Sequence, residues 1–284
     1  MKSTVRATMH GAISIVNAIA TGNGSALGIS LKVIAEIALE KGHGIKYTTN
    51  QKDKLITNVI RNSIPNNIIN KNSIYVNIVS EIPIGFGLKS SSAVSNAVAL
   101  ACNKLVNEKI DDRAVLDAAV RASVDTKVTI TGAYDDSTAC YFGGFVITDN
   151  YAHKLIRRDR APDNLYAIIF IPSIRNRINI DKLSIMADLF SEAFKLAKSG
   201  DYWKAMKLNG VICSSVFSKE YAPLLEALEK GALAASISGN GPSIAAVTHK
   251  DQIEEIKSVF IKFNGRVLVS KVNNQKASVE KIIG

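Results

Sequence analysis

The chain has 284 residues, of which 47% are hydrophobic and 21% charged, and its formal net charge is +10. This composition predicts a globular protein with a sizeable core and roughly one or two domains. The sequence has no stretch of about 20 apolar residues that could span a membrane. Its first ten residues, MKSTVRATMH, are too polar for the apolar region of a signal peptide. We therefore expect a cytoplasmic protein without a membrane partner.

Cysteine and histidine spacing indicates neither a disulfide framework nor a zinc site, because Cys102, Cys140, Cys213 and the four histidines are scattered. The positive charge suits nucleic acid, anionic membranes or small anionic substrates. However, the basic cluster at 157–160 is interrupted by an aspartate, and aromatic residues make up only 6% of the chain. We therefore expect no nucleic-acid partner, but a solvated basic surface that also attracts phosphate and carboxylate ligands.

Strands and helices alternate along the first half of the chain. We predict strands at 2–8, 31–39 and 74–79, a short helix and then a loop broken at Pro65 within 48–72, and helices at 90–106 and 111–123. The apolar residues of 90–106 recur every three or four positions and so form one face. Serines at its start can cap free N–H groups. After Gly132 we expect a tight acidic turn at 134–137, followed by an apolar strand with two glycines at 143–144.

The alternation of strands and helices begins again at about residue 165. We predict a strand at 166–171, helices at 181–198, 201–213 and 223–230, two short strands within 236–247, a helix at 252–263, a strand at 266–272 and a helical tail. Strands and paired helices on both sides of residue ~150 indicate an α+β protein. We expect two domains, at 1–150 and 151–284.

Three glycine-rich segments stand out. In the first, at 21–28, the third glycine comes one residue too late for a dinucleotide-binding fingerprint, so a Rossmann site is weakly supported and a turn between strands is the alternative. The third, at 236–243, is typical of a hairpin turn and could form a second wall of a phosphate site. The acidic pair Asp135 and Asp136 is either a solvated turn or a site that orients or deprotonates a hydroxyl group in phosphoryl transfer.

The second segment, at 83–93, predicts a nucleotide site. Its candidate binding residues are Pro83, Gly85, Gly87, Leu88, Lys89, Ser90, Ser91, Ser92 and Ala93. Leu88 stands where a Walker motif needs glycine. Even so, glycines allow close backbone approach, and the following helix points free N–H groups and its positive dipole end at the loop. Serine oxygens there can bind phosphate or Mg²⁺.

The order of these motifs resembles the GHMP kinases, named for galactokinase, homoserine kinase, mevalonate kinase and phosphomevalonate kinase. Their second motif is Pro-x-x-x-Gly-Leu-Gly-Ser-Ser-Ala. Residues 83–92 of this chain match the motif, except that Lys89 replaces its last glycine and Ser92 replaces its alanine. Residues 238–243 are similar to their third motif. Within the family, segments 16–22, 87–93 and 131–136 most resemble the archaeal shikimate kinases.

The resemblance implies an N-terminal α+β domain and a C-terminal ferredoxin-like domain. It also implies ATP, Mg²⁺ and phosphorylation of the 3-hydroxyl of shikimate, a step in aromatic amino acid biosynthesis. By position, Asp136 matches the catalytic aspartate of the mevalonate-kinase-like members, and Asp135 is the alternative. Ser90 and Ser91 match the phosphate and magnesium serines.

Several assignments stay open. Homoserine, mevalonate or a basic RNA-binding role are the alternatives to shikimate. Lys89 is either a charge on the phosphates or a surface lysine. The family's first-motif lysine has no clear counterpart, although His10 lies nearby. The oligomeric state is not predicted. Candidate partners for the substrate carboxylate are Arg121, Lys127, Arg175 and Arg177.

Overall fold

A long β-hairpin organises the first half of the molecule. The computed structural model describes residues 3–48, 53–173, 180–217 and 222–282. In this part of the chain, seven strands form one sheet in the order β11-β1-β2-β4-β3, with β5 pairing both β2 and β6. The strands are β1 (Ser3–Val16), β2 (Asn23–Lys41), β3 (Ile45–Tyr47), β4 (Asn72–Ser80), β5 (Phe145–Asp149), β6 (Lys154–Asp159) and β11 (Ser278–Ile282).

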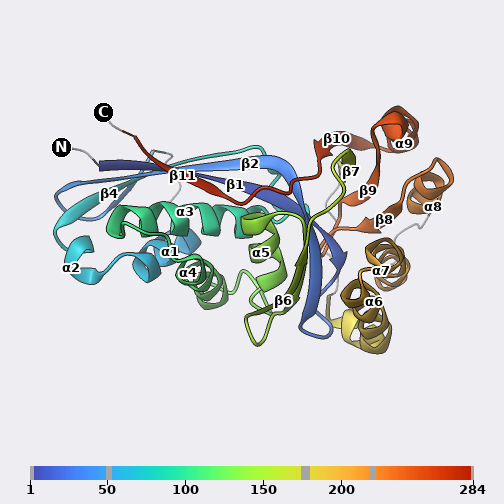
Figure 1. Cartoon of the computed structure of the whole chain (residues 1–284), viewed down its shortest axis with the longest axis horizontal. Coiled ribbons are helices and arrows are strands. Elements are labelled where there is room, and N and C mark those ends of the chain that lie inside the picture. Colours follow the sequence, from blue (N-terminus) through green and yellow to red (C-terminus); the bar gives the residue numbers. More distant parts are fainter. Residues whose placement is uncertain (1–2, 49–52, 174–179, 218–221, 283–284) are drawn as a thin grey trace.

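Helices cover one face of this sheet (Figure 1). They are α1 (Lys54–Ser63), α2 (Asn66–Ile69), α3 (Ser90–Val106), α4 (Asp112–Asp125) and α5 (Tyr134–Phe142). The predicted helices at 90–106 and 111–123 are thus confirmed as α3 and α4. A reciprocal pair of hydrogen bonds fixes α5 against α3, because the Asn96 amide donates to the Ser137 carbonyl and the Ser137 hydroxyl donates back to Asn96, both at 3.0 Å.

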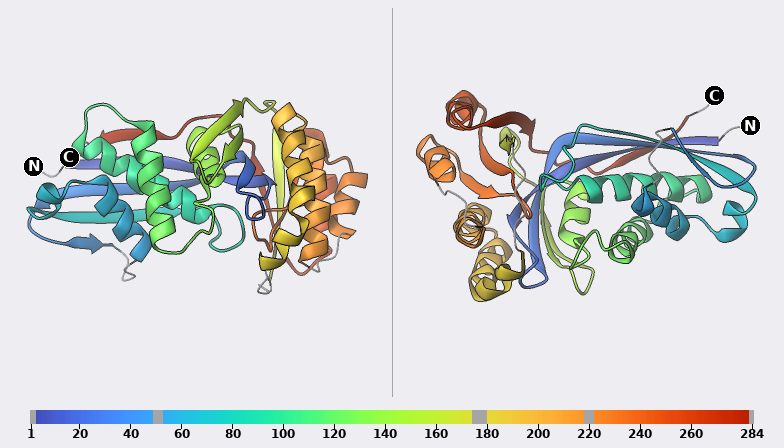
Figure 2. Two further views of the ribbon diagram at one scale, coloured as in Figure 1. Left: turned by 90° about the horizontal axis from the view of Figure 1, so that it is seen from below. Right: turned by 180° about the vertical axis from the view of Figure 1, so that it is seen from behind.

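The second half forms a separate four-stranded sheet in the order β10-β7-β9-β8. Its strands are β7 (Leu165–Pro172), β8 (Ala234–Ile237), β9 (Ile244–His249) and β10 (Gly265–Lys271). Its helices are α6 (Ala187–Ser199), α7 (Tyr202–Val216), α8 (Ala222–Glu229) and α9 (Ile253–Phe260), which gather at the end of the molecule opposite the start of β1 and the end of β11 (Figure 2). Here α7 packs against β8 and α9 against β7, whereas α6 packs against α7 and contacts β1 and β2 of the first sheet. In chain order, helices α6 to α8 lie between the first two strands, β7 and β8, and α9 lies between the last two, β9 and β10. This connectivity, together with the order of the strands in the sheet, confirms the ferredoxin-like arrangement.

Two predicted elements are wrong. The expected acidic turn at 134–137 is the first turn of α5, which is buried on most sides and therefore shows no amphipathic period in the sequence. The expected helical tail is β11, whose residues pair with β1 from Thr4↔Ile282 to Thr8↔Ser278. The free edge of β1 supplies hydrogen bonds to that segment, which the tail sequence alone does not reveal.

The chain does not pass from the first sheet to the second at residue 150. Strand β6 still belongs to the first sheet, and β11 returns to it at the end of the described chain. The division into domains at 1–150 and 151–284 stays a prediction. Among the described residues, no helix combines the length and apolar character that crossing a membrane requires.

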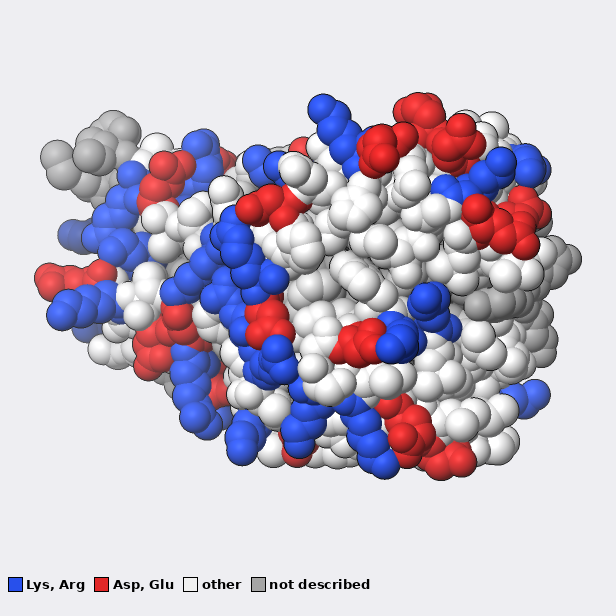
Figure 3. All heavy atoms as spheres, turned by 45° about the vertical axis from the view of Figure 1, so that its right-hand side comes forward, with Lys and Arg blue, Asp and Glu red and all other residues white. Residues whose placement is uncertain are grey.

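Charges are mixed over the face shown in Figure 3. Lysine and arginine side chains form a band there, but acidic side chains interrupt it. The rest of this face carries broad uncharged areas. On this face, basic and acidic side chains are therefore interspersed, and the lysines and arginines form no unbroken basic patch.

Candidate active site

A cavity of about 530 Å³ lies where the second half of β1, the starts of α3 and α5, and the 238–241 loop meet. From the predicted set, it is lined by Gly85, Gly87, Leu88, Lys89, Ser90, Ser91, Ser92, Asp135 and Asp136. Two predicted residues are absent from its wall: Pro83 is not among the lining residues, and Ala93 is fully buried in the core. The glycine-rich loop and the acidic pair, about 50 residues apart in the sequence, thus share one site.

The loop before α3 is shaped by left-handed backbone. Gly85, Gly87 and Lys89 have φ values of 80°, 79° and 64°. Lys89 is the N-cap of α3, and its side chain makes no capping hydrogen bond there. The first N–H groups of this 17-residue helix therefore face the cavity without a side-chain cap, which is the arrangement that binds phosphate at helix N-termini.

The 238–241 loop packs directly on this loop. The Ser238 hydroxyl donates to the Gly87 carbonyl at 2.7 Å, and the Asn17 amide donates to the Gly239 carbonyl at 3.0 Å. A Cβ atom on Gly87 would lie only 2.0 Å from the Ser238 carbonyl oxygen, so this approach requires glycine. The third glycine-rich segment is indeed a second wall of the cavity; phosphate binding by it stays a prediction.

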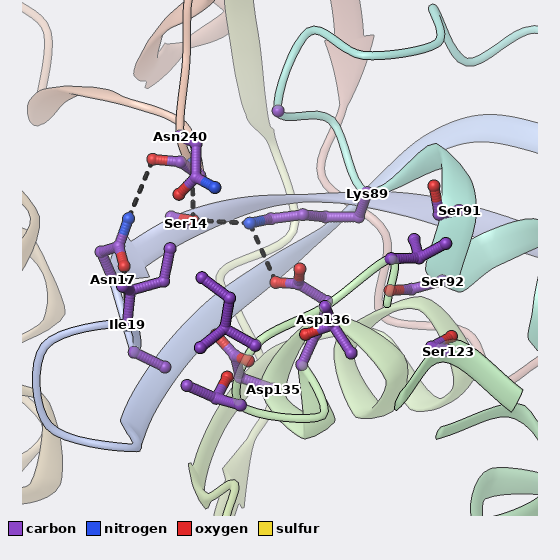
Figure 4. A pocket seen from close by; sticks show the side chains of 18 of the residues that line it. Ser14, Asn17, Ile19, Lys89, Ser91, Ser92, Ser123, Asp135, Asp136 and Asn240 are labelled. Carbon is purple, nitrogen blue, oxygen red and sulfur yellow. Dashed lines mark hydrogen bonds and ion pairs between the residues drawn. The ribbon is translucent and has the colours of Figure 1, made fainter. Parts of the chain in front are cut away.

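Lys89 is not a surface residue. Its ammonium lies 2.9 Å from Asp136 Oδ1 and donates to Ser14 Oγ at 2.8 Å (Figure 4). Only 6% of the side chain is exposed. Burial opposes the charged form, but the negative charges of Asp136 and then Asp135 outweigh it and raise the pKa of Lys89. The surface-lysine interpretation is therefore wrong.

Asp135 and Asp136 occupy different environments. Asp135 is buried and receives a 2.7 Å hydrogen bond from the Asn150 amide, whose oxygen in turn accepts from the Asp135 backbone N–H. Burial first, and then the charge of Asp136, raise the pKa of Asp135 to about 7. Asp136 keeps 19% of its side chain exposed and pairs with Lys89. Both carboxylates line the cavity, and Asp136 is the more accessible of the two.

The first glycine-rich segment, at 21–28, packs against the Asp135 carboxyl group. It is a turn followed by the start of β2, which confirms the turn interpretation and not the Rossmann site. A Cβ atom on Gly24 would lie 2.5 Å from Asp135 Oδ2. Glycine at this position therefore makes room for the buried carboxyl group.

Sequence reasoning missed several residues that build the site. Ser14, Asn17 and Ser123 line the cavity, and the Asn150 amide donates a hydrogen bond to Asp135. A signal existed for Ser14, because a polar residue interrupts the apolar stretch 12–16, all of which is buried. Asn150 had no such signal, since only the fold brings it next to α5.

The candidates for binding a substrate carboxylate separate clearly. Lys127 lines the cavity, whereas Arg121 does not. Arg175 and Arg177 lie outside the described residues. His10 is buried in β1 and is not among the lining residues either, so its position gives it no role in this cavity.

The oxygen atoms of the site suit a Mg²⁺ ion that is bound together with a nucleotide, and not a metal ion held by protein side chains alone. Among the described residues, no group of three or more His, Cys, Asp or Glu side chains converges on one point. Mg²⁺ bound with a nucleotide takes only one or two protein ligands and completes its shell with phosphates and water. Ser90 and Ser91 lie at the start of α3 beside the cavity and can supply such oxygens.

Known proteins are similar in sequence to this chain along almost its whole length. Residues 54–144 match the family model of the GHMP kinases N-terminal domain, and residues 193–266 match that of the C-terminal domain. A shikimate kinase from Methanobrevibacter smithii is 34% identical over 297 residues, which cover 96% of this chain and 98% of that protein. The chain belongs to the GHMP kinase family. A shikimate kinase from Methanosarcina mazei is 38% identical, with 95% of each chain covered.

Solved structures of GHMP kinases share the fold at lower identity. A homoserine kinase from Cytophaga hutchinsonii has a TM-score of 0.74 at 21% identity and covers 98% of this chain and 97% of its own. An L. major mevalonate kinase, in complex with R-mevalonate, has a TM-score of 0.73 at 15% identity and covers 95% and 96%. These likenesses confirm the two-part α+β fold, and the family implies ATP as the phosphoryl donor.

Proposed function

We propose that this GHMP kinase transfers the γ-phosphoryl group of ATP to the 3-hydroxyl of shikimate, giving shikimate 3-phosphate and ADP. The observation that carries the proposal is the shared cavity, in which the open N-terminus of α3 faces the Asp136 carboxylate. The archaeal relatives named shikimate kinases, which match nearly end to end, support shikimate as the acceptor. Aromatic amino acid biosynthesis in the cytoplasm is the expected setting.

Nucleotide and acceptor have opposite sides of the cavity available. Ser91 and Ser92 lie on one side of the Lys89–Asp136 pair, and Asn17, Ile19 and Asn240 lie on the other (Figure 4). The open N–H groups of α3 attract the phosphates on the first side. We place shikimate on the second side, where the side-chain amides of Asn17 and Asn240 can bind hydroxyl groups.

The transfer itself needs positioning and charge stabilisation more than covalent chemistry by the protein. The shikimate oxygen forms a bond to the γ-phosphorus while the bond from that phosphorus to the β,γ-bridging oxygen breaks, and ADP leaves with that electron pair. The proton of the attacking hydroxyl passes to the Asp136 carboxylate. Mg²⁺, when bound, neutralises phosphate charge, and Ser90 or Ser91 is the residue we expect to hold it.

The substrate carboxylate needs a cationic partner. Of the four arginines and lysines considered, Lys127 is the described residue that lines the cavity. It follows α4 and has a left-handed backbone with φ of 57°. Lys127 therefore serves either this carboxylate or the phosphates.

A coupled ADP-release assay tests the proposal. The purified protein is given ATP and Mg²⁺ with shikimate, homoserine or mevalonate in parallel. We expect ADP release to depend on shikimate, with shikimate 3-phosphate identified as the product by mass spectrometry. Turnover of homoserine or mevalonate, but not of shikimate, would overturn shikimate as the acceptor. If none of the three compounds stimulates ADP release, the protein is not a kinase for these acceptors.

A further inference from the structure

The hydroxyl group of Ser14 joins three parts of the site. It accepts a hydrogen bond from the Lys89 ammonium at 2.8 Å and another from the Gly239 backbone N–H at 2.9 Å. Ser14 lies in β1, Lys89 at the start of α3 and Gly239 in the loop between β8 and β9. A serine oxygen has two lone pairs, so both are occupied and Ser14 Oγ is fixed from two sides.

The position of Ser14 leaves it little freedom to move. Its residue is 1% exposed, and its backbone N–H donates to the Ser238 hydroxyl at 3.2 Å. Ser238 in turn donates to the Gly87 carbonyl. The hydroxyl that receives Lys89 is thus held by the same network that fixes the glycine-rich loop.

Lys89 reaches Asp136 from an unusual backbone. Its φ of 64° is a left-handed conformation that side chains disfavour, and such positions persist where the surrounding structure enforces them. A lysine has four rotatable side-chain bonds and would lose its aim without a second contact. Within the described residues, the two polar side chains that contact the Lys89 ammonium are Asp136 and Ser14.

We propose that Lys89 is a catalytic cation for the transferred phosphoryl group and the Asp136 carboxylate, and that Ser14 is the positioning residue that aims it. The inference rests on the proposed phosphoryl transfer and deepens it, because it moves Lys89 from general nucleotide binding to the reacting atoms. The ammonium holds Asp136 toward the acceptor hydroxyl and meets negative charge that develops between donor and acceptor. Ser14 acts only through the direction it gives to Lys89.

Kinetics of a double-mutant cycle test this division of roles. Lys89→Met removes the ammonium and should lower kcat by about 100-fold or more, while the KM for ATP changes by only about twofold. Ser14→Ala should lower kcat by about 10-fold. If Ser14 works through Lys89, the double variant should be no slower than Lys89→Met alone. Ser191→Ala and Lys262→Met are matched controls, because neither residue lines the cavity. The Ser191 hydroxyl donates to the Ala187 carbonyl within α6, and Lys262, which follows α9, pairs with Glu226 in α8.

Two results would overturn the inference. One is a double variant whose losses in kcat multiply, because independent effects mean that Ser14 does not act through Lys89. The other is a Lys89→Met variant that raises the KM for ATP and keeps its kcat, which would return Lys89 to ordinary nucleotide binding. If the wild-type protein does not phosphorylate shikimate, the proposed function fails first and separately.

A crystal structure of Ser14→Ala gives a readout that needs no turnover. We expect the Lys89 side chain to leave its single position and its ammonium to lose the 2.9 Å pair with Asp136 Oδ1. The glycine-rich loop and α3 should stay in place, which separates misdirection of Lys89 from unfolding. An unchanged Lys89–Asp136 pair in that variant contradicts the positioning role of Ser14.

Discussion

The contact between the glycine-rich loop and the 238–241 loop can be tested by adding one methyl group. In Gly87→Ala the new Cβ atom would lie 2.0 Å from the Ser238 carbonyl oxygen and 2.9 Å from its carbonyl carbon. These are backbone atoms, so no side-chain rotation relieves the overlap. Gly44 is a matched control, because its φ of 86° is equally left-handed but no atom lies within 4 Å of its added Cβ.

The expected losses of stability follow from these two environments. A Cβ atom on left-handed backbone destabilises either variant by about 1–2 kcal/mol. In Gly87→Ala the two loops must also separate, which breaks the Ser238–Gly87 hydrogen bond, a further loss of about 1 kcal/mol, and disturbs the packing around it. We therefore expect a loss of about 1 kcal/mol in Gly44→Ala and about 3 kcal/mol in Gly87→Ala.

Urea unfolding and calorimetric titration with an ATP analogue measure the two consequences. Gly44→Ala should bind nucleotide like the wild-type protein. Gly87→Ala should bind it about tenfold more weakly or worse, since a loss of about 1.4 kcal/mol in binding is one factor of ten. Equal destabilisation of the two variants, with unchanged nucleotide affinity in both, would refute the close packing of these loops and with it the two-walled site.

Substitutions at three positions test single residues. Asp136→Asn should lower turnover ~100-fold or more in the ADP-release assay with nucleotide affinity retained; near-normal turnover would exclude Asp136. Lys89→Gly and Lys89→Ala should lose activity equally, but only glycine relieves the φ of 64°, so in urea it should be about 1 kcal/mol the more stable; the opposite order would contradict the left-handed backbone. Because the pKa of Asp135 is raised from 3.8 to about 7, the folded state binds the extra proton between these values and loses stability as pH rises through them. Asp135→Asn should therefore gain stability relative to wild type as pH rises from about 4 to about 7, and parallel curves would argue against a buried, protonated carboxyl.

Local patterns predicted the structure of the glycine-rich loop at 83–93 and of the helix that follows it. The helix at 90–106 and the Gly-Ser loop before it depend on neighbours in the sequence, namely an apolar repeat and the backbone freedom of glycine. The structure confirms both. The two short strands around the 238–241 turn were predictable for the same reason.

Elements whose structure depends on distant partners were not predictable in this way. The helix α5 is buried on most sides, so its sequence shows neither a strong period nor a surface face. The terminal segment 278–282 becomes a strand because β1 offers it an unpaired edge. In both places the partner lies far away in the sequence.

The sequence by itself determined that glycines and serines precede a helix, whose first N–H groups suit an anion, and that two carboxylates follow in a short segment. Only the tertiary structure decided which groups meet. It brings Asp135 into a hydrogen bond with Asn150 and Asp136 into an ion pair with Lys89. It also places the Ser14 hydroxyl within hydrogen-bond distance of the Lys89 ammonium. The physical reason is that helix starts and turns arise from local hydrogen bonding. Burial, ion pairing and the pKa of a carboxyl depend on atoms that only folding brings within a few ångströms.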